Sequence, residues 1–314
     1  MSRQWGLRLA CAVKPRGVAN SVGTTYHLDG NHAREPGGLF NQMRIAEQPP
    51  RQTTVSVAFF MGNGVGQDSL HPREARLLGP RAVPKRRNDF VRGRWVGREL
   101  ARLSLGLDPH HVAILPDDQG VPWLDHDDEG RLPYSLSLSH TSGVAAAAMV
   151  ELPCRVGVDV ECPLQAPTAI ARDYFAPIEA RRYEGASDEE MAWRGAEVWS
   201  LKEAVLKALG LGLSVSASTV TVLSVEDTSA SAGWYDAKIM VAQTVLPEGM
   251  RVEAWVQRQP SAVLAVAALY GEAHGHPVPR APLLLAHLTG ESTRCPFPGP
   301  RNAEPISRRE GANT

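Results

Sequence analysis

The chain has 314 residues, of which 43% are hydrophobic and 21% charged, and its formal net charge is −1. This is the composition of a globular protein with a sizeable core, and it excludes bulk charge as the means of recognising phosphate or nucleic acid. The four cysteines (Cys11, Cys154, Cys162 and Cys295) lack zinc-finger spacing and are too few to indicate a disulfide scaffold, so we expect reduced thiols in a cytoplasmic protein.

The two ends of the chain differ in composition from its middle. Residues 1–53 mix Gly, Asn, Arg and Pro without a sustained period, which predicts a flexible extension. Residues 273–314 are rich in Pro, Gly and Arg and predict a mostly disordered tail, in which "LLLAHL" would favour a short helix. No apolar run approaches the length of a membrane span, and we expect no targeting peptide.

The middle of the chain predicts an α+β protein. A strand begins at "TVSVAFF", a basic helix follows at "KRRNDFVRGRWVGRELARLSLG", and apolar strands cover residues 144–150 and 156–160. A second helix ends in "WSLKEAVLKALG", with Gly210 as its expected C-terminal stop, and strands follow near residues 218–225, 236–243, 251–258 and 262–270. Runs of strands between a few helices indicate largely antiparallel sheets. The order occurs twice, which predicts subdomains at 54–165 and 166–272, although no residue-level repeat is evident.

The first helix carries a concentration of positive charge. Seven basic residues stand against the single acid Asp89: Arg81, Lys85, Arg86, Arg87, Arg92, Arg94 and Arg98. Guanidinium groups bind phosphate oxygens bidentately, so this helix predicts a local anion-binding surface. A solvated helix face is the alternative interpretation.

The strand "VGVDVEC" brings two carboxylates together. Its valines alternate with polar residues, so Asp159 and Glu161 project from the same face. Adjacent carboxylates repel each other unless a proton or a cation lies between them, and oxygen ligands of this kind suit Mg²⁺. A polar outer face of a half-exposed strand is the alternative.

The second helix combines a core-facing stripe with a charged group between apolar neighbours. The stripe consists of residues at helical spacing: Leu201, Ala204, Val205, Ala208 and Leu209. Glu203 lies on the other side, between Trp199 and Leu206, with Lys207 four residues later. An i,i+4 ion pair contributing about 0.2–0.5 kcal/mol is one explanation. A third carboxylate for a metal, with lysines for a phosphate, is the other.

In this order, "KRRNDF…GR", "SH", "GVDVE" and "WSLKEAVLKALGLGL" resemble the 4′-phosphopantetheinyl transferases of the larger, monomeric class, over about residues 70–225. The resemblance implies an α+β (α/β) fold of two similar subdomains related by a pseudo-twofold axis, each a small, mostly antiparallel sheet packed with helices. It implies transfer of 4′-phosphopantetheine from coenzyme A to a serine of an apo acyl or peptidyl carrier protein of polyketide, nonribosomal peptide, siderophore or fatty-acid synthesis. It also implies Mg²⁺ as cofactor, with no nucleic-acid or membrane partner.

The resemblance also implies roles for individual residues. The metal ligands would be Asp159, Glu161 and Glu203. The coenzyme A contacts would be Arg86, Arg94, Ser139, His140, Asp159, Lys202 and Lys207. The catalytic residues would be Glu203 as general base, with a water activated by Glu161 as the alternative, and Lys207. Gln119 stands where some relatives carry a lysine, which puts one phosphate contact in doubt, and Mn²⁺ would suit the same oxygen ligands.

Two other functions remain open at this point. One is a different Mg²⁺-dependent phosphoryl or nucleotidyl transferase that uses the same carboxylates and releases no 3′,5′-ADP. The other is a non-catalytic nucleic-acid-binding protein that uses the helix between Arg81 and Arg98, whose binding would weaken steeply with salt.

Overall fold

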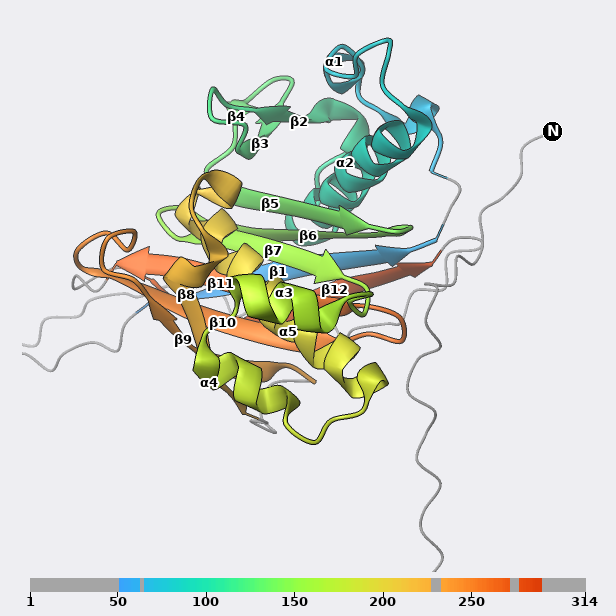
Figure 1. Ribbon diagram of the computed structural model, residues 1–314. Helices are drawn as coiled ribbons and strands as arrows, with labels where there is room; N and C mark the ends of the chain where they lie inside the picture. The colour runs from blue at the N-terminus through green and yellow to red at the C-terminus, as the bar shows by residue number, and fades with distance from the viewer. Residues whose placement is uncertain (1–50, 63–64, 227–232, 272–276, 290–314) are drawn as a thin grey trace, which may run out of the picture. The chain divides into compact units, whose positions relative to one another are not determined.

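The computed structural model describes residues 51–62, 65–226, 233–271 and 277–289, and they form two halves built around two large sheets (Figure 1). The N-terminal sheet has the strand order β12 (Val278–Thr289), β1 (Gln52–Met61), β6 (Val144–Glu151) and β5 (Tyr134–Thr141). The C-terminal sheet has the order β7 (Arg155–Glu161), β11 (Val263–Gly271), β10 (Met250–Arg258), β9 (Tyr235–Val241) and β8 (Val220–Glu226). A small third sheet contains β2 (Val112–Pro116), β3 (Pro122–His126) and β4 (Gly130–Arg131). Neighbouring strands pair antiparallel except β1 and β12, which are parallel.

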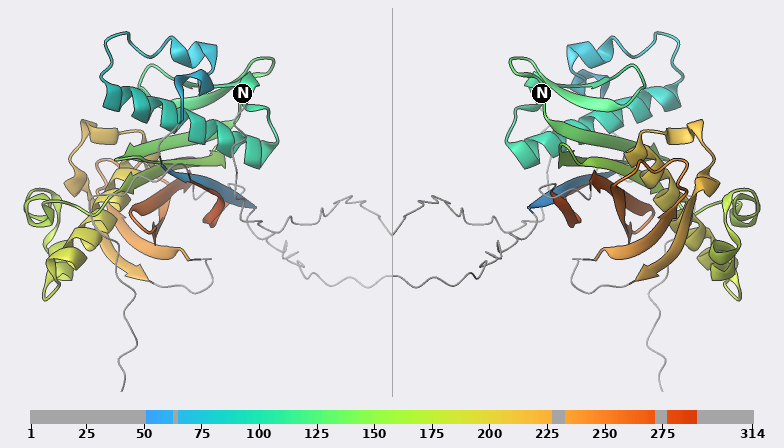
Figure 2. Two further views of the ribbon diagram at one scale, coloured as in Figure 1. Left: turned by 90° about the vertical axis from the view of Figure 1, so that its right-hand side faces the viewer. Right: turned by 90° about the vertical axis from the view of Figure 1, so that its left-hand side faces the viewer.

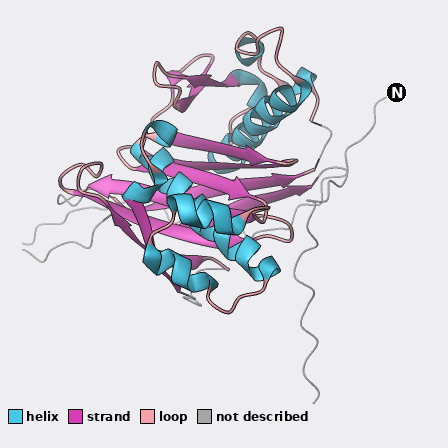
Figure 3. Ribbon diagram, in the orientation of Figure 1, coloured by secondary structure: helices cyan, strands magenta, loops and turns pink. Residues whose placement is uncertain are grey.

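Helices accompany both sheets (Figure 3). The N-terminal half contains α1 (Pro72–Ala75) and α2 (Pro84–Leu105), and the C-terminal half contains α3 (Pro167–Tyr174), α4 (Pro177–Ala180) and α5 (Asp188–Leu209). Short 3₁₀ turns link them: η1 (Gln67–Ser69), η2 (Pro109–His111), η3 (Arg181–Tyr183), η4 (Gly212–Ser214) and η5 (Ala217–Thr219). The predicted α+β class, with antiparallel sheets and helices in both halves, is confirmed.

The two large sheets share a buried apolar cluster, and the long helices cover their other faces. Phe59 of β1 and Val266 of β11 belong to the shared cluster, whereas Phe60 packs toward α2 and Ala267 toward α5. The two views in Figure 2 show α2 along one side of the strands and the α3–α5 helices along another. Because β6 and β11 are buried on both faces, their sequences "VAAAAMV" and "VLAVAALY" are apolar without alternation.

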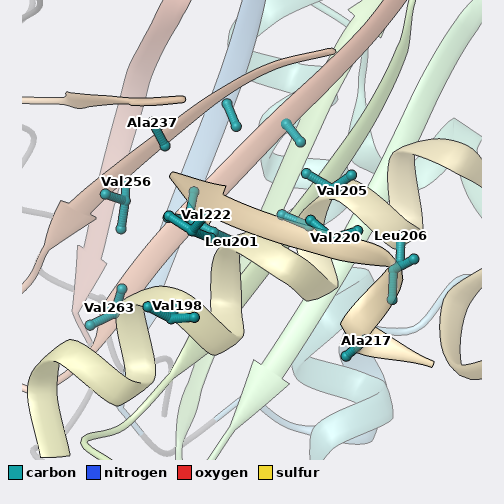
Figure 4. Packing of buried hydrophobic residues seen from close by; sticks show 14 of the residues in the cluster. Val198, Leu201, Val205, Leu206, Ala217, Val220, Val222, Ala237, Val256 and Val263 are labelled. Carbon is teal, nitrogen blue, oxygen red and sulfur yellow. The ribbon is translucent and has the colours of Figure 1, made fainter. Parts of the chain in front are cut away.

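Helix α5 packs its predicted core stripe onto the C-terminal sheet. In Figure 4, Leu201 and Val205 lie beside Val220 and Val222 of β8. All four side chains are fully buried, and each stabilises the fold by roughly 1.5–3 kcal/mol. The helix ends at Gly210 with φ 75°, the left-handed conformation that glycine adopts without strain.

The two halves contain a residue-level repeat that sequence inspection missed. Helices α2 and α5 each have 22 residues and end at a left-handed glycine, Gly106 and Gly210. When the helix ends are aligned, "WVGRELARLSLG" and "WSLKEAVLKALG" share a Trp, a basic residue followed by Glu, and a final Leu-Gly. Each is preceded by a short helix with a capping-box glutamate, in "PREA" and in "PIEA". These features are what two copies of one structural unit would retain.

The expected boundaries need two corrections. Residues Val278–Thr289, expected to lie in a disordered tail with a short helix at "LLLAHL", instead form β12 and pair with β1. Strand β7, placed in the N-terminal subdomain by the expected boundary at residue 165, instead pairs with β11 in the C-terminal sheet. Residues 1–50 and 290–314, for which we expected flexibility or disorder, lie outside the described residues.

Two smaller expectations can also be compared with the structure. Cys154 is a free, buried thiol, as expected. Among the helices of the described residues, none is both long enough and apolar enough to cross a membrane.

Strand β12 should stabilise the fold, because it covers the outer edge of β1 and buries Ala286 and Leu288. We expect a chain truncated after residue 272 to unfold at a lower temperature, by several degrees, than a chain truncated after residue 290. Calorimetry of both truncations isolates the contribution of β12. Equal melting temperatures would contradict the pairing.

Candidate functional site

The candidate site begins with a line of hydroxyl groups that joins the two halves. Strands β5 and β7 belong to different sheets, yet backbone N–H groups of β7 donate hydrogen bonds to serine side chains of β5. These bonds are Val156 N to Ser135 Oγ (3.1 Å), Val158 N to Ser137 Oγ (3.0 Å) and Val160 N to Ser139 Oγ (3.3 Å). Alternate residues of a strand share one face, so "SLSLSHT" places four hydroxyls toward β7. We call Ser135, Ser137, Ser139 and Thr141 the hydroxyl ladder.

The last two hydroxyls of the ladder also hold the carboxylates of β7. Ser139 Oγ donates to Asp159 Oδ1 at 2.8 Å, and Thr141 Oγ1 donates to Glu161 Oε2 at 3.3 Å. The predicted pair of carboxylates therefore projects toward one place, at the ends of β5 and β7.

Helix α5 adds a third carboxylate and a cation. Lys207 Nζ donates to Asp159 Oδ1 at 2.7 Å and to the Val158 carbonyl oxygen at 3.1 Å. Glu203 is only 8% exposed. The helix can come this close because residue 157 is glycine: a Cβ there would lie 2.6 Å from the Ala208 nitrogen and closer still to the Ala204 carbonyl oxygen.

The three carboxylates interact electrostatically. Burial, together with the charges of Asp159 and Glu203, raises the pKa of Glu161 to about 7, against the opposing effects of Thr141 and Lys207. Burial and the charge of Asp159 also raise the pKa of Glu203, with Lys207 opposing. Within the described part of the chain, Asp159 Oδ2 and Glu203 Oε1 are buried without a hydrogen-bond partner. Such a group of carboxylates favours a bound proton or cation.

The donor set fits a hard divalent cation. All three side chains supply oxygen, and two of the oxygens have no hydrogen-bond partner among the described residues. No three His, Cys, Asp or Glu side chains of the described residues are close enough to hold an ion by themselves. Mg²⁺ is usually held by one or two carboxylates together with substrate phosphates and water, so the arrangement fits an ion shared with a phosphate ligand.

A pocket of about 440 Å³ lies beside the ladder, between the start of α2 and the end of β5. Its lining residues are Val83, Lys85, Arg86, Asp89, Phe90, Arg94 and His140. It brings together three predicted coenzyme A contacts, Arg86, Arg94 and His140. The side chain of His140 projects to the face of β5 opposite Ser139 and Thr141, but the charge of Lys207 acts both on His140 and on Glu161, so the pocket and the carboxylates lie within electrostatic reach of one cation.

The charged groups of this pocket are partly desolvated. The Arg94 guanidinium lies over the Phe90 ring at 3.5 Å, and its Nε is buried without a described partner. Burial lowers the pKa of Arg94 to about 10, with Glu74 opposing and Arg98 adding to the effect. His140 Nδ1 lies 3.8 Å from Asp89 Oδ2. Burial, Lys207 and Lys85 lower the pKa of His140, against the effect of Asp89.

The basic helix is less exposed than its sequence indicates. Arg92 is buried and bound to Asp89 at 3.1 Å, and Arg98 is buried and bound to Glu74. The helix therefore does not present all its cations to solvent. A nucleic-acid footprint requires exposed cations, so this burial weakens that alternative.

Lys202 does not lie where the resemblance implied. Its side chain is fully buried, and its Nζ lies 2.9 Å from Glu179 Oε2 and also donates to the Val220 carbonyl oxygen. Lys202 thus holds α4, α5 and β8 together instead of facing a phosphate. Glu179 also accepts a hydrogen bond from Val222 N at 2.7 Å.

The N-terminal half repeats this buried pair. Arg98 is the fifteenth residue of α2, as Lys202 is of α5, and it binds the capping-box residue Glu74. Glu74 accepts a hydrogen bond from Ile114 N at 2.8 Å, the counterpart of the bond from β8 to Glu179. The basic residue before the shared glutamate is therefore an internal clamp in both halves.

Three residues of the site were not predicted, although each had a signal. Thr141 continues the Ser-x-Ser-x-Ser alternation, Asp89 is a lone acid among seven bases, and Glu179 lies in a "PIEA" that matches the earlier "PREA". Gln119 is exposed in the turn between β2 and β3, where its backbone N–H bonds Asp117 Oδ1 at 2.9 Å.

Comparison with known families agrees with this geometry. Residues 155–263 match the model of the 4′-phosphopantetheinyl transferase superfamily, and residues 73–150 match that of the 4′-phosphopantetheinyl transferase N-terminal domain. The two matches together cover more than half of the chain. The chain belongs to the 4′-phosphopantetheinyl transferase superfamily. The match over residues 155–263 begins at Arg155, the first residue of β7, where the C-terminal sheet starts.

Curated relatives resemble parts of this superfamily member. It is 31% identical over 134 residues to the 4′-phosphopantetheinyl transferase HetI of Nostoc sp., a match over 42% of this chain and 55% of HetI. It is 30% identical over 152 residues to a putative 4′-phosphopantetheinyl transferase of Synechocystis sp., over 48% of this chain and 61% of that protein. A 4′-phosphopantetheinyl transferase of Bacillus subtilis is 25% identical over 131 residues, over 41% and 55%. The chain thus spans little more than half the length of these relatives.

The buried pair in this phosphopantetheinyl transferase family member can be tested by stability. We expect Lys202→Met to lower the free energy of unfolding by about 3–5 kcal/mol, because it leaves the Glu179 charge buried and unpaired. The double variant Glu179→Gln/Lys202→Met should recover most of that loss in urea denaturation. A Lys202→Met variant as stable as the wild type would contradict the buried pair. Such a result is expected only if the lysine faces solvent and ligand.

The raised pKa of Glu161 predicts a pH dependence in EDTA. The folded pKa of about 7 lies above the ordinary value of 4.5, so the folded state binds the proton more tightly and wild-type stability falls as pH rises between these values. Glu161→Gln lacks this loss. Between pH 5 and pH 8 we expect its stability to gain on the wild type by roughly 1–3 kcal/mol. Parallel pH profiles in urea denaturation would show that Glu161 titrates normally.

Proposed function

We propose that the protein transfers the 4′-phosphopantetheine group of coenzyme A to a serine hydroxyl of an apo acyl or peptidyl carrier protein and releases 3′,5′-ADP. The observation that carries the proposal is the group of three carboxylates, Asp159, Glu161 and Glu203, beside a pocket with Arg86, Arg94 and His140. Coenzyme A carries a diphosphate and a distant 3′-phosphate. The carboxylates would hold a divalent ion for the diphosphate, and the cationic pocket would bind the 3′-phosphate.

The pocket is suited to the 3′-phosphate end of coenzyme A. The Arg94 guanidinium lies over the Phe90 ring, and its buried Nε has no described partner, so it offers a pre-oriented donor. Arg86 is exposed at the rim, and His140 lies within reach of the Lys207 charge. Lys207 and Ser139 would meet the diphosphate, since both already contact Asp159.

Asp159, Glu161 and Glu203 would hold the Mg²⁺ ion, or Mn²⁺, which accepts the same ligands. When bound, such an ion stabilises negative charge on phosphate oxygens and on a leaving group. The low exposure of Asp159 and Glu203 strengthens every charge interaction in the site. Lys207 would neutralise charge on the same side.

The reaction needs a base, because a serine hydroxyl does not ionise at neutral pH. The serine oxygen forms a bond to the phosphorus that carries pantetheine, and the bond from that phosphorus to the bridging oxygen of 3′,5′-ADP breaks, with the electron pair leaving on that oxygen. Glu203 would accept the serine proton, since its Oε1 has no partner within the described segments and its pKa is raised. A water held by Glu161 is the alternative. A positioned base contributes about 10²–10⁴-fold in rate.

The partner class belongs to the proposal as well. A carrier domain would present its serine at the ends of β5 and β7, where the carboxylates converge. We propose a monomeric cytoplasmic enzyme without nucleic-acid or membrane partners, as the sequence led us to expect.

Intact-protein mass spectrometry tests this function. An apo carrier incubated with the protein, coenzyme A and Mg²⁺ should gain one phosphopantetheine, and EDTA should abolish the gain. We expect Glu203→Gln to lose transfer by about 10²-fold or more while coenzyme A still binds. The matched control is Glu99→Gln, at the equivalent position of α2, which should keep transfer within a few fold.

Each failure has a distinct meaning. Normal turnover by Glu203→Gln would exclude Glu203 as the base. If several diverse apo carriers stay unmodified while coenzyme A binds, the proposed class of acceptor protein is wrong. Cleavage of a nucleotide without formation of 3′,5′-ADP would favour the other Mg²⁺-dependent transferase chemistry.

A further inference from the structure

We propose that Thr141 is a positioning residue that aims Glu161 at the metal ion. The inference rests on the ion site of the proposed function and assigns a role to a residue outside the expected ligand set. The inference starts from the hydrogen bond that Thr141 Oγ1 donates to Glu161 Oε2 at 3.3 Å.

Thr141 is held on a rigid element. It is the fourth hydroxyl in the alternation of β5, and its backbone pairs with Val144 in the β5–β6 hairpin. The preceding hydroxyls of the ladder bind backbone N–H groups of β7. The position of Thr141 relative to β7 is therefore set by the same seam, which makes its hydroxyl a fixed donor.

Glu161 depends on this donor more than Asp159 depends on any single donor, because Asp159 has two. The backbone of Glu161 is fixed by pairing with Val263 of β11, but its side chain has three rotatable bonds and lies near the charges of Asp159 and Glu203. These charges push its carboxylate away from the place where an ion would bind. A hydrogen bond to Oε2 resists that movement and leaves Oε1 to face the ion.

The three carboxylates are held in different ways, which makes the role separable. Asp159 receives hydrogen bonds from Ser139 and Lys207, so loss of Thr141 leaves it in place. Removing an outer partner of a metal-ligating carboxylate typically lowers metal affinity or activity about 10–100-fold. Loss of the Thr141 hydroxyl should therefore weaken ion binding through Glu161 alone.

Binding of Mn²⁺ to the full chain with excess coenzyme A and no carrier protein, followed by the EPR signal of the free ion, tests the inference without any reaction and supplies the phosphate ligand that the site shares with the ion. We expect Thr141→Val, which keeps the side-chain shape and removes the hydroxyl, to raise the Kd for Mn²⁺ about 10-fold. Thr141→Ser keeps the donor and should stay within about 3-fold of the wild type.

The matched control is Ser137→Ala, which removes a hydroxyl of the same ladder that bonds Val158 N and no carboxylate. It should lower the melting temperature and change the Kd by less than about 2-fold, well below the effect of losing an outer metal partner. An unchanged Kd in Thr141→Val, an equal loss in Ser137→Ala, or no Mn²⁺ binding by the wild type would each overturn the inference.

A kinetic readout separates this inference from the proposed function. In the transfer reaction, Thr141→Val should raise the Mg²⁺ concentration for half-maximal rate, and saturating Mg²⁺ should restore kcat. If the wild type modifies no carrier while the Mn²⁺ pattern holds, the function fails and the positioning role stands. If transfer proceeds and the Mn²⁺ pattern is absent, the proposed function stands and the positioning role of Thr141 fails.

Discussion

The site depends on one seam, the hydroxyl ladder between β5 and β7. The backbone N–H groups on one edge of β7 face strand β11. Those on the other edge donate hydrogen bonds to serine hydroxyls, and without the serines they would be buried without partners. Because side chains alternate along a strand, a slip of β5 by one residue would replace the serines with leucines in this seam. The ladder therefore sets the register of the two halves, and with it the positions of Ser139 against Asp159 and Thr141 against Glu161.

The two halves share one plan and contribute different chemistry. Both contain a 22-residue helix, a capping-box glutamate and a buried cation at the same helix position. The shared glutamate of α2, Glu99, pairs with Arg102, whereas Glu203 of α5 lies beside the carboxylates of β7. Helix α2 instead supplies Arg94 to the pocket that His140 also lines. The common scaffold thus separates charge recognition from the carboxylate site, and the buried pairs keep both long helices in place because leaving either charge unpaired would be costly.

Local patterns predicted most elements, and non-local contacts account for the errors. The alternation in "VGVDVE" predicted that Asp159 and Glu161 share a face, and the family resemblance added Glu203; in the structure the charges of Asp159 and Glu203 both act on Glu161. Lys202 was misplaced because neighbouring residues of a helix point about 100° apart, and its partner Glu179 lies 23 residues earlier. Strand β12 was missed since its prolines hide a pairing with β1, which is more than 200 residues away in the chain. Thr141 was overlooked because its partner is on another sheet, and only the assembled halves bring the two residues together.

The most direct test of this account is amide hydrogen exchange at Val156, Val158 and Val160, measured by NMR. These N–H groups belong to no backbone ladder between β5 and β7, and the account predicts slow exchange because serine hydroxyls accept their hydrogen bonds. It also predicts that Ser137→Ala speeds exchange mainly at Val158. Rapid exchange of all three amides in the wild type would contradict the seam, and with it the way in which the two halves form one site.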